Sequence, residues 1–253
     1  MNLPAGANRL LTPDDPPPVV VTNEAGASPF LLLGDHAGRA VPAALAGLGL
    51  QPPAMDAHIA WDIGVAGLGE RLSAALDACF VRQTYSRLVI DCNRRPGAAD
   101  ETPAVSDGVA VPGNAALDAA ALDARRTEIA QPYQARIAAL LDTRQGRPTL
   151  LVSLHSFTPA MQGRARPWRY GVLHRGDSAL SSRMLTLLRE QLGDEAGDNQ
   201  PYAMDGTDHT VPLHADARGL DYLELEVRQD LIADPAGQSA AAGMLSRLLR
   251  QAA

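Results

Sequence analysis

The sequence predicts an α/β fold with a mixed, mainly parallel sheet that helices cover on both faces. Short β-rich apolar runs alternate along the chain with longer segments whose apolar residues recur at helical spacing, which is the pattern of such folds. The 253 residues contain no internal repeat and no Pro/Gly/Ser-rich linker that would divide them. We therefore expect residues 1–253 to form a single domain.

The N-terminal stretch predicts a loose tail over residues 1–20. Residues 1–18 are rich in proline and polar side chains and lack the apolar core of a secretory signal. Elsewhere no run approaches the roughly 20 apolar residues that cross a bilayer. We expect a cytoplasmic protein with no membrane partner.

The elements follow in order from the apolar pattern. Two long segments have helical spacing in the first half, and Pro132 should interrupt the second of them. Runs rich in β-branched and aromatic residues predict the strands. The expected strands are 29–34, 79–83, 88–92, 149–154, 170–174 and 222–228, and the expected helices are 54–78, 117–143, 178–192 and 239–251.

The charge balance excludes several functions. All 22 basic residues are arginines, so neither a Schiff-base lysine nor the lysine of a phosphate-binding loop is available. A net charge of −7 argues against nucleic acid as a partner. An anionic small molecule would need a local arginine cluster. The two cysteines, Cys79 and Cys92, lie in apolar runs and are expected to be buried free thiols. No seam or heptad indicates an oligomeric state.

Two histidines lie where strand-like runs end, and together they suggest a metal centre. His36 follows the apolar run that ends at Gly34, and His155 follows the run that ends at Leu154. Imidazole is the commonest protein metal ligand, and a catalytic zinc usually takes three protein ligands. His58 and Asp62 would share one face of the predicted helix, so both could point toward one centre. Asp62 is our choice for the third ligand, because two histidines and a carboxylate are a common catalytic zinc set. His58 stays open as a ligand, as a partner of a ligand or as a capping residue.

Arginines and an asparagine predict a carboxylate site. Asn93 and Arg94 close the predicted strand 88–92, and a guanidinium fork can bind a carboxylate through two parallel hydrogen bonds. Arg87 and Arg166 could add positive charge. A surface role is the open alternative for these side chains.

The run 222–228 alternates strictly and places carboxylates on one face. Glu224 and Glu226 share that face with Arg228, while leucines and a valine line the other. Glu226 is interpreted as a general base that takes a proton from the attacking water. A salt-bridged surface strand is the alternative. Upstream, residues 209–214 predict a loop over the pocket, from which His214 could contact substrate.

The assembled motifs resemble the N-formylglutamate amidohydrolase family, which is similar to the zinc carboxypeptidases and aspartoacylase-type deacylases. The segments that carry the likeness are 35–38, 58–64, 85–94, 155–159, 166–168 and 226–231. The resemblance implies a three-layer α/β/α fold like that of zinc carboxypeptidases and one zinc ion, although another divalent ion could replace it. It also implies hydrolysis of N-formyl-L-glutamate to formate and L-glutamate, a step of histidine breakdown.

The resemblance assigns roles residue by residue. His36 and His155 match the zinc histidines, Asn93 and Arg94 match the pair that holds the substrate carboxylate, and Glu226 matches the general base. One position departs from the carboxypeptidase pattern. That group has a ligand glutamate three residues after its first histidine, where this chain has Arg39. Asp62 is proposed as the replacement ligand.

Two other functions stay open at this point. One is an amidohydrolase or peptidase acting on a different N-acyl amino acid or small peptide, which would use the same residues. The other is a non-catalytic module that binds acidic amino acids through the arginines without a metal.

Overall fold

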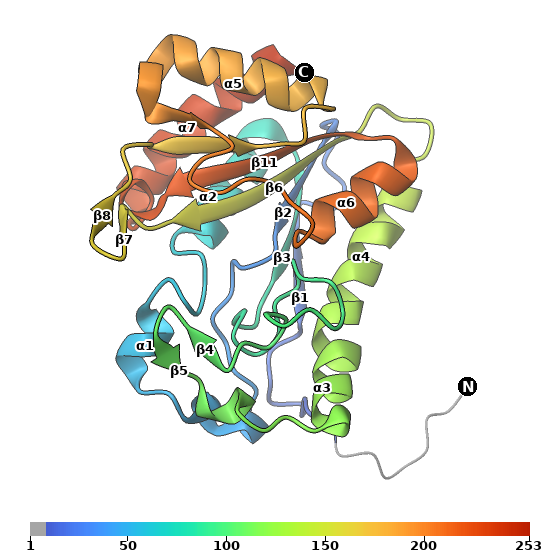
Figure 1. Cartoon of the computed structure of the whole chain (residues 1–253). Coiled ribbons are helices and arrows are strands. Elements are labelled where there is room, and N and C mark those ends of the chain that lie inside the picture. The colour runs from blue at the N-terminus through green and yellow to red at the C-terminus, as the bar shows by residue number, and fades with distance from the viewer. Residues whose placement is uncertain (1–8) are drawn as a thin grey trace.

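A seven-stranded mixed sheet runs through the centre of the molecule (Figure 1). The structure is a computed structural model and describes residues 9–253. Along the sheet the strand order is β1-β3-β2-β6-β11-β9-β10. The strands are β1 (Val19–Thr22), β2 (Phe30–Gly34), β3 (Cys79–Gln83), β6 (Leu150–Phe157), β9 (Tyr170–Leu173), β10 (Ala196–Asp198) and β11 (Asp221–Arg228).

The four central strands β3, β2, β6 and β11 run parallel to one another. Strand β1 is antiparallel to β3 at one edge, and β9 is antiparallel to β11 near the other, with β10 parallel to β9. The carboxyl ends of the parallel strands therefore meet at one edge of the sheet, which is where ligand sites of α/β folds lie. The predicted fold class is confirmed.

Helices cover both faces of the sheet, and Figure 1 shows them as separate layers. Helices α2, α5 and α7 pack on one face, and α4 and α6 pack on the other. The helices are α1 (Pro52–Asp56), α2 (Val65–Leu76), α3 (Ala119–Arg125), α4 (Gln131–Asp142), α5 (Ala179–Leu192), α6 (Thr210–Ala215) and α7 (Pro235–Ala252). Two short hairpins complete the fold: β4 (Val105–Ser106) with β5 (Val109–Ala110), and β7 (Ala160–Met161) with β8 (Arg164–Ala165). Among the described residues no helix is long and apolar enough to cross a membrane.

The predicted helix 54–78 is wrong in its first half. The short helix α1 ends at Asp56, residues 57–64 form turns, and helix α2 begins only at Val65. Gly64 explains the boundary: its φ is +87°, and a Cβ there would lie 2.2 Å from the carbonyl oxygen of Ile232. A left-handed φ interrupts an α-helix, and only glycine fits this close contact with Ile232. The helix therefore begins after Gly64.

The predicted strand 88–92 is also wrong, because these residues form a turn and an irregular segment. Leu88, Val89 and Ile90 are buried against loops in a third apolar cluster, so their β-rich character reflects burial and not strand pairing. The buried guanidinium of Arg125 forms a hydrogen bond to the backbone of this segment. Arg125 donates to the carbonyl oxygens of Val89 (2.8 Å) and Gly113 (3.0 Å) and to Asn114 Oδ1 (2.6 Å).

The segment 117–143 is helical over most of its length, as predicted, but the interruption expected at Pro132 is absent and only the winding changes before it. A π-turn, η3 (Arg126–Ala130), joins α3 to α4. Proline lacks the N–H that an α-helix interior requires, so a wider turn just before it relieves the missing bond.

The expectation of a loose tail over residues 1–20 is wrong for the part that the structure describes; residues 1–8 lie outside it. The backbone N–H groups of Leu10 and Leu11 donate to the Glu128 carboxylate at 2.8 and 2.9 Å. Leu10 is buried, and β1 begins at Val19. A side-chain anchor on the π-turn thus fixes this segment, and no pattern within residues 1–20 could indicate a partner so distant in sequence.

Candidate active site

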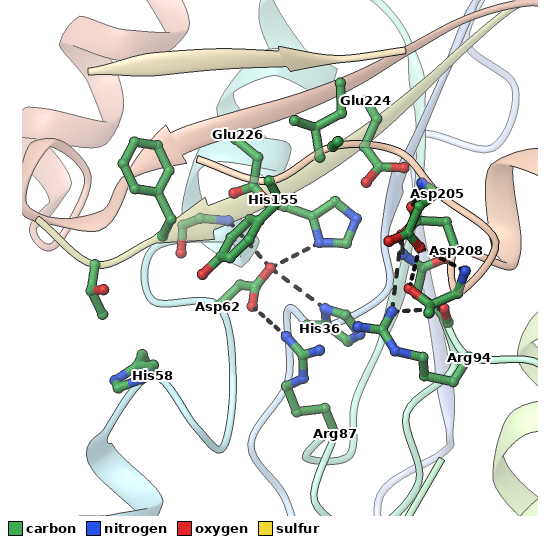
Figure 2. Close-up of a pocket in the computed structure, with 18 residues that line it drawn as sticks. His36, His58, Asp62, Arg87, Arg94, His155, Asp205, Asp208, Glu224 and Glu226 are labelled. Atoms are coloured by element: carbon green, nitrogen blue, oxygen red, sulfur yellow. Dashed lines mark hydrogen bonds and ion pairs between the residues drawn. The ribbon is translucent and has the colours of Figure 1, made fainter. Parts of the chain in front are cut away.

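A cavity of about 350 Å³ lies at the carboxyl edge of the parallel strands. It is large enough for an amino acid derivative. Its wall brings together side chains from β6, β11, the loops after β2 and β3, and the loop between β10 and α6 (Figure 2). Most of the residues that the sequence analysis singled out contribute to this wall.

His36, Asp62 and His155 form a buried cluster at the base of the cavity. Asp62 Oδ2 lies 3.6 Å from His36 Nδ1 and 3.0 Å from His155 Nδ1, and the two imidazole rings are 5.1 Å apart. Asp62 reaches this place from the turn before α2, because its backbone N–H donates to the carbonyl oxygen of His36 at 2.8 Å. The expected convergence is present, although the helix on which we argued it is absent.

The cluster fits a divalent cation. Ligand atoms about 2.0–2.1 Å from one tetrahedral zinc ion stand about 3.3 Å from each other, close to the spacings between Asp62 and the two imidazoles. His36 Nδ1 is buried and has no hydrogen-bond partner among the described residues. A nitrogen lone pair held in this way, beside a carboxylate, is suited to binding a metal.

Each imidazole has a buried carboxylate behind it. His36 Nε2 lies 2.7 Å from Asp91 Oδ1. His155 Nε2 lies 3.5 Å from Asp35 Oδ2 and 3.1 Å from Ser153 Oγ, which donates to Asp35. When Nε2 carries the proton and donates it to these partners, Nδ1 is left unprotonated and faces Asp62. Such carboxylate–histidine pairs orient metal ligands and raise their basicity.

The pKa shifts reflect this concentration of carboxylates. Burial alone would lower the pKa of His155, but Asp35 and Asp62 outweigh burial and raise it well above the usual value. Burial would raise the pKa of Asp62, but both histidines outweigh it and lower that pKa. The cluster therefore attracts positive charge.

Glu226 and Glu224 project into the cavity from β11. Glu226 is paired in register with His155 on the adjacent strand, and Glu224 with Ser153. Both carboxyl groups are buried, and each has an oxygen without a hydrogen-bond partner. Burial raises the pKa of Glu226 to about 7 and that of Glu224 to about 8. The salt-bridged surface strand is thereby excluded, since Arg228 pairs with Asp230.

Arg94 lines the opposite wall, where it is partly paired. Its Nε donates to Asp100 Oδ2 at 2.6 Å, and one Nη lies 3.9 Å from Asp208 Oδ1. Asn93 also lines the cavity, but Asn93 Oδ1 accepts from the N–H groups of His209 and Thr210 and its amide donates to Asp208. Asn93 thus holds the start of α6 in place.

Arg87 lies beside the cluster. It donates to Asp91 Oδ2 through Nε (3.0 Å) and Nη2 (2.6 Å), and its other Nη lies 3.6 Å from Asp62 Oδ1. Its guanidinium connects the carboxylate behind His36 to the carboxylate in the cluster. Arg87 still lines the cavity and can face a bound anion there.

Two predicted substrate contacts lie outside the cavity wall. His214 is buried in α6, where its Nε2 lies 2.7 Å from Gln134 Oε1; the expected loop is this short helix. Arg166 stacks on the ring of Tyr202 at 4.8 Å and donates to Thr158, so it supports residues of the wall. His214 faces the helix layer because Thr210–Ala215 coils, which turns its side chain away from the site.

His58 and Arg39 both lie away from the buried cluster. His58 is on the rim, 3.3 Å from Asp107, and is not in the cluster. Arg39 is exposed, is paired with Asp56 and stacks on Trp61. Gly38, the residue before Arg39, packs closely against the backbone of the next segment. A Cβ at Gly38 would lie 2.0 Å from the carbonyl oxygen of Thr84.

Sequence reasoning missed five acidic residues around the cavity: Asp35, Asp91, Asp205, Asp208 and, as a candidate, Glu224. Asp35 and Asp91 adjoin residues that were selected, so their position beside His36 and Asn93 was a usable signal. Asp208 gave no signal, because its contact with Arg94 and Asn93 joins loops more than 100 residues apart.

The cavity holds the components of a hydrolase site: two imidazoles with a carboxylate between them, a buried unpaired glutamate and nearby arginines. The chain belongs to the N-formylglutamate amidohydrolase family, which it matches over residues 28–233. Membership makes it a hydrolase of amide bonds.

Solved structures share the fold of this chain. A gene product of Agrobacterium tumefaciens is 37% identical, with a TM-score of 0.93 over 96% of this chain and 98% of that one. An N-formylglutamate amidohydrolase from Ralstonia eutropha is 20% identical, with a TM-score of 0.67 over 93% of this chain and 97% of that one, and shares the fold. No curated protein matches the chain.

Proposed function

We propose that this protein is a metal-dependent amidohydrolase that cleaves the amide of an N-acylated amino acid. N-formyl-L-glutamate is the first candidate substrate, because the family carries that name. The observation that carries the proposal is the placement of Glu226 beside the His36–Asp62–His155 cluster, with its carboxyl group buried and unpaired.

His36, Asp62 and His155 would hold the metal, with zinc as the expected ion. When bound, it would supply Lewis acidity to the scissile carbonyl and to the attacking water. Asp91 and Asp35 fix the orientation of the two imidazoles, and Arg87 fixes Asp91 and Asp62. These residues prepare the cluster before substrate binds.

Glu226 handles the proton. As the water oxygen bonds to the acyl carbon, Glu226 accepts the water proton, and it returns that proton to the amide nitrogen as the C–N bond breaks. A pKa of about 7 suits both steps near neutral pH, since a base and its conjugate acid are then both available. The products are a carboxylic acid, formate in the first candidate, and a free amino acid.

Arg94 is proposed to hold the α-carboxylate of the substrate through the donors that Asp100 and Asp208 leave available. Arg87 could offset negative charge on the carbonyl oxygen as the tetrahedral species forms. A substrate with a different side chain is the second candidate, because the wall beside Arg94 is acidic. Asp205, Asp208 and Glu224 all line it.

Purified protein tests the proposal. We expect zinc at about one ion per chain and release of formate from millimolar N-formyl-L-glutamate or a related N-formyl amino acid. Removal of the metal with a chelator should abolish release, and zinc should restore it. Zinc-free protein that binds acidic amino acids without turnover would favour the non-catalytic module.

A further inference from the structure

Several carboxyl groups line the cavity between His155 and the loop 199–209. Figure 2 shows Glu224 pointing into the cavity between His155 and the two loop residues Asp205 and Asp208. Glu226 follows two residues later on the same face of β11. The proposed mechanism uses Glu226 and leaves the other three without a role.

Glu224 is the informative member of this wall. Its side chain is 2% exposed, and it makes no hydrogen bond or ion pair with any described residue. A buried carboxyl group without a donor is costly, so such a group aimed into a cavity indicates that a ligand supplies the donor. Arg94, which lines the same cavity, is bound by Asp100 and approaches Asp208, and it forms no ion pair with Glu224.

A second metal ion does not account for the wall. Within residues 9–253, the cluster of His36, Asp62 and His155 is the group of His, Cys, Asp and Glu side chains whose ligand atoms approach within 4.8 Å of one another. Glu224, Asp205 and Asp208 are too far apart to share one small cation. An ammonium or guanidinium group needs only one of these carboxylates as a direct hydrogen-bond acceptor, because its charge is attracted to the others at longer range.

We propose that Glu224, with Asp208 and Asp205, forms a subsite for a cationic nitrogen of the substrate. This inference rests on the proposed amide hydrolysis and specifies its substrate class: an N-acyl amino acid that carries a positive charge away from the scissile bond. Arg94 holds the carboxylate, Glu226 and the cluster act on the amide, and Glu224 accepts hydrogen bonds from the cation. N-formyl-L-glutamate would then be a poorer substrate, because its side-chain carboxylate would face this wall.

The cation could belong to either side of the scissile amide. It could be the side-chain ammonium of the amino acid, as in N-formyl-L-lysine, formylated on its α-nitrogen. It could also be the α-ammonium of an aminoacyl group, as in a dipeptide. Two matched pairs separate these sources. N-formyl-L-lysine is compared with N-formyl-L-norleucine, and glycyl-L-norleucine with N-propionyl-L-norleucine; each pair differs chiefly in one charged nitrogen.

The test measures kcat/KM of the zinc-loaded protein for both pairs and for N-formyl-L-glutamate. We expect the cationic member of one pair to exceed its neutral partner by about tenfold or more, which is the effect of one well-placed ionic hydrogen bond. Glu224→Gln should remove most of that ratio. Glu190→Gln, which removes an exposed carboxylate from α5, should retain it. Equal rates within both pairs, or a preference that persists in Glu224→Gln, would overturn the subsite.

A binding measurement keeps this inference separate from the proposed reaction. Calorimetry compares L-lysine with L-norleucine, and glycinamide with propionamide, against the zinc-loaded protein. Tighter binding of one cationic member supports the subsite even if no compound is cleaved, in which case the proposed hydrolysis is what fails. No preference for either cation, in binding and in turnover alike, rejects the subsite.

Discussion

The two faces of strands β6 and β11 differ in chemistry although their residues alternate along the same segments. One face carries Val152, Leu154, Leu223, Leu225 and Val227, all buried under α2, α5 and α7. The other carries Ser153, His155, Glu224 and Glu226, which are also buried, and the last three line a cavity. The side chains on the two faces are therefore equally buried. They differ in that only those on the polar face need hydrogen-bond partners. The apolar face stabilises the fold, and the polar face is held in an unsatisfied arrangement that substrate can complete.

The largest expected effect comes from the polar face. Glu226→Gln keeps the shape of the side chain but removes its ability to accept a proton, so turnover should fall by several orders of magnitude while folding and metal content stay intact. Steady-state kinetics with metal analysis and circular dichroism check this. Turnover at the level of the parent protein would remove Glu226 from the reaction.

On the apolar face, Leu225→Ala should act in the opposite way. It removes a fully buried side chain between the two residues Glu224 and Glu226, and deletions of this kind cost about 2–5 kcal/mol of unfolding free energy. Activity per folded molecule should stay near that of the parent. Urea unfolding and kinetics on the folded fraction separate the two effects, and a specific activity reduced as strongly as by Glu226→Gln would contradict the division between faces.

A smaller effect is expected behind the site. Asp91→Asn keeps the size of the side chain but weakens its hold on His36 and Arg87, so metal affinity should fall by roughly 10–100-fold. Competition with a chromophoric chelator measures this affinity. Asp100→Asn, which alters an exposed partner of Arg94, serves as the control and should leave metal affinity unchanged.

The sequence predicted the strands and helices whose own residue pattern shows which side chains are buried. Strict alternation in residues 222–228 and the apolar runs at 30–34 and 79–83 identify strands, because one face or both must be buried. It also located His36, which follows the end of β2. For His155 the predicted strand end was wrong, because β6 continues to Phe157 and His155 reaches the cavity from within the strand.

Prediction failed where distant contacts decide the structure. Residues 88–92 have strand-like composition, yet they pack as a buried loop bound by Arg125, which no local pattern reveals. Asp62 reached the cluster through its backbone bond to His36 and not through the helix face we invoked. His214 was misplaced because six residues of α6 are too few for a clear helical period. The position of Glu224 in the cavity wall was missed because its neighbours there come from a loop that the sequence does not locate.

Arg125 gives the loop that carries Arg87, Asp91 and Arg94 an anchor that a regular strand would otherwise provide. Two of its acceptors are the backbone carbonyl oxygens of Val89 and Gly113 and the third is the side-chain oxygen of Asn114, so a single planar cation joins two separate segments of the chain. A chain without lysine has used the one basic side chain whose fork can bridge such acceptors simultaneously. The loop around the cavity is therefore held in place by this buried side chain and not by pairing with the sheet.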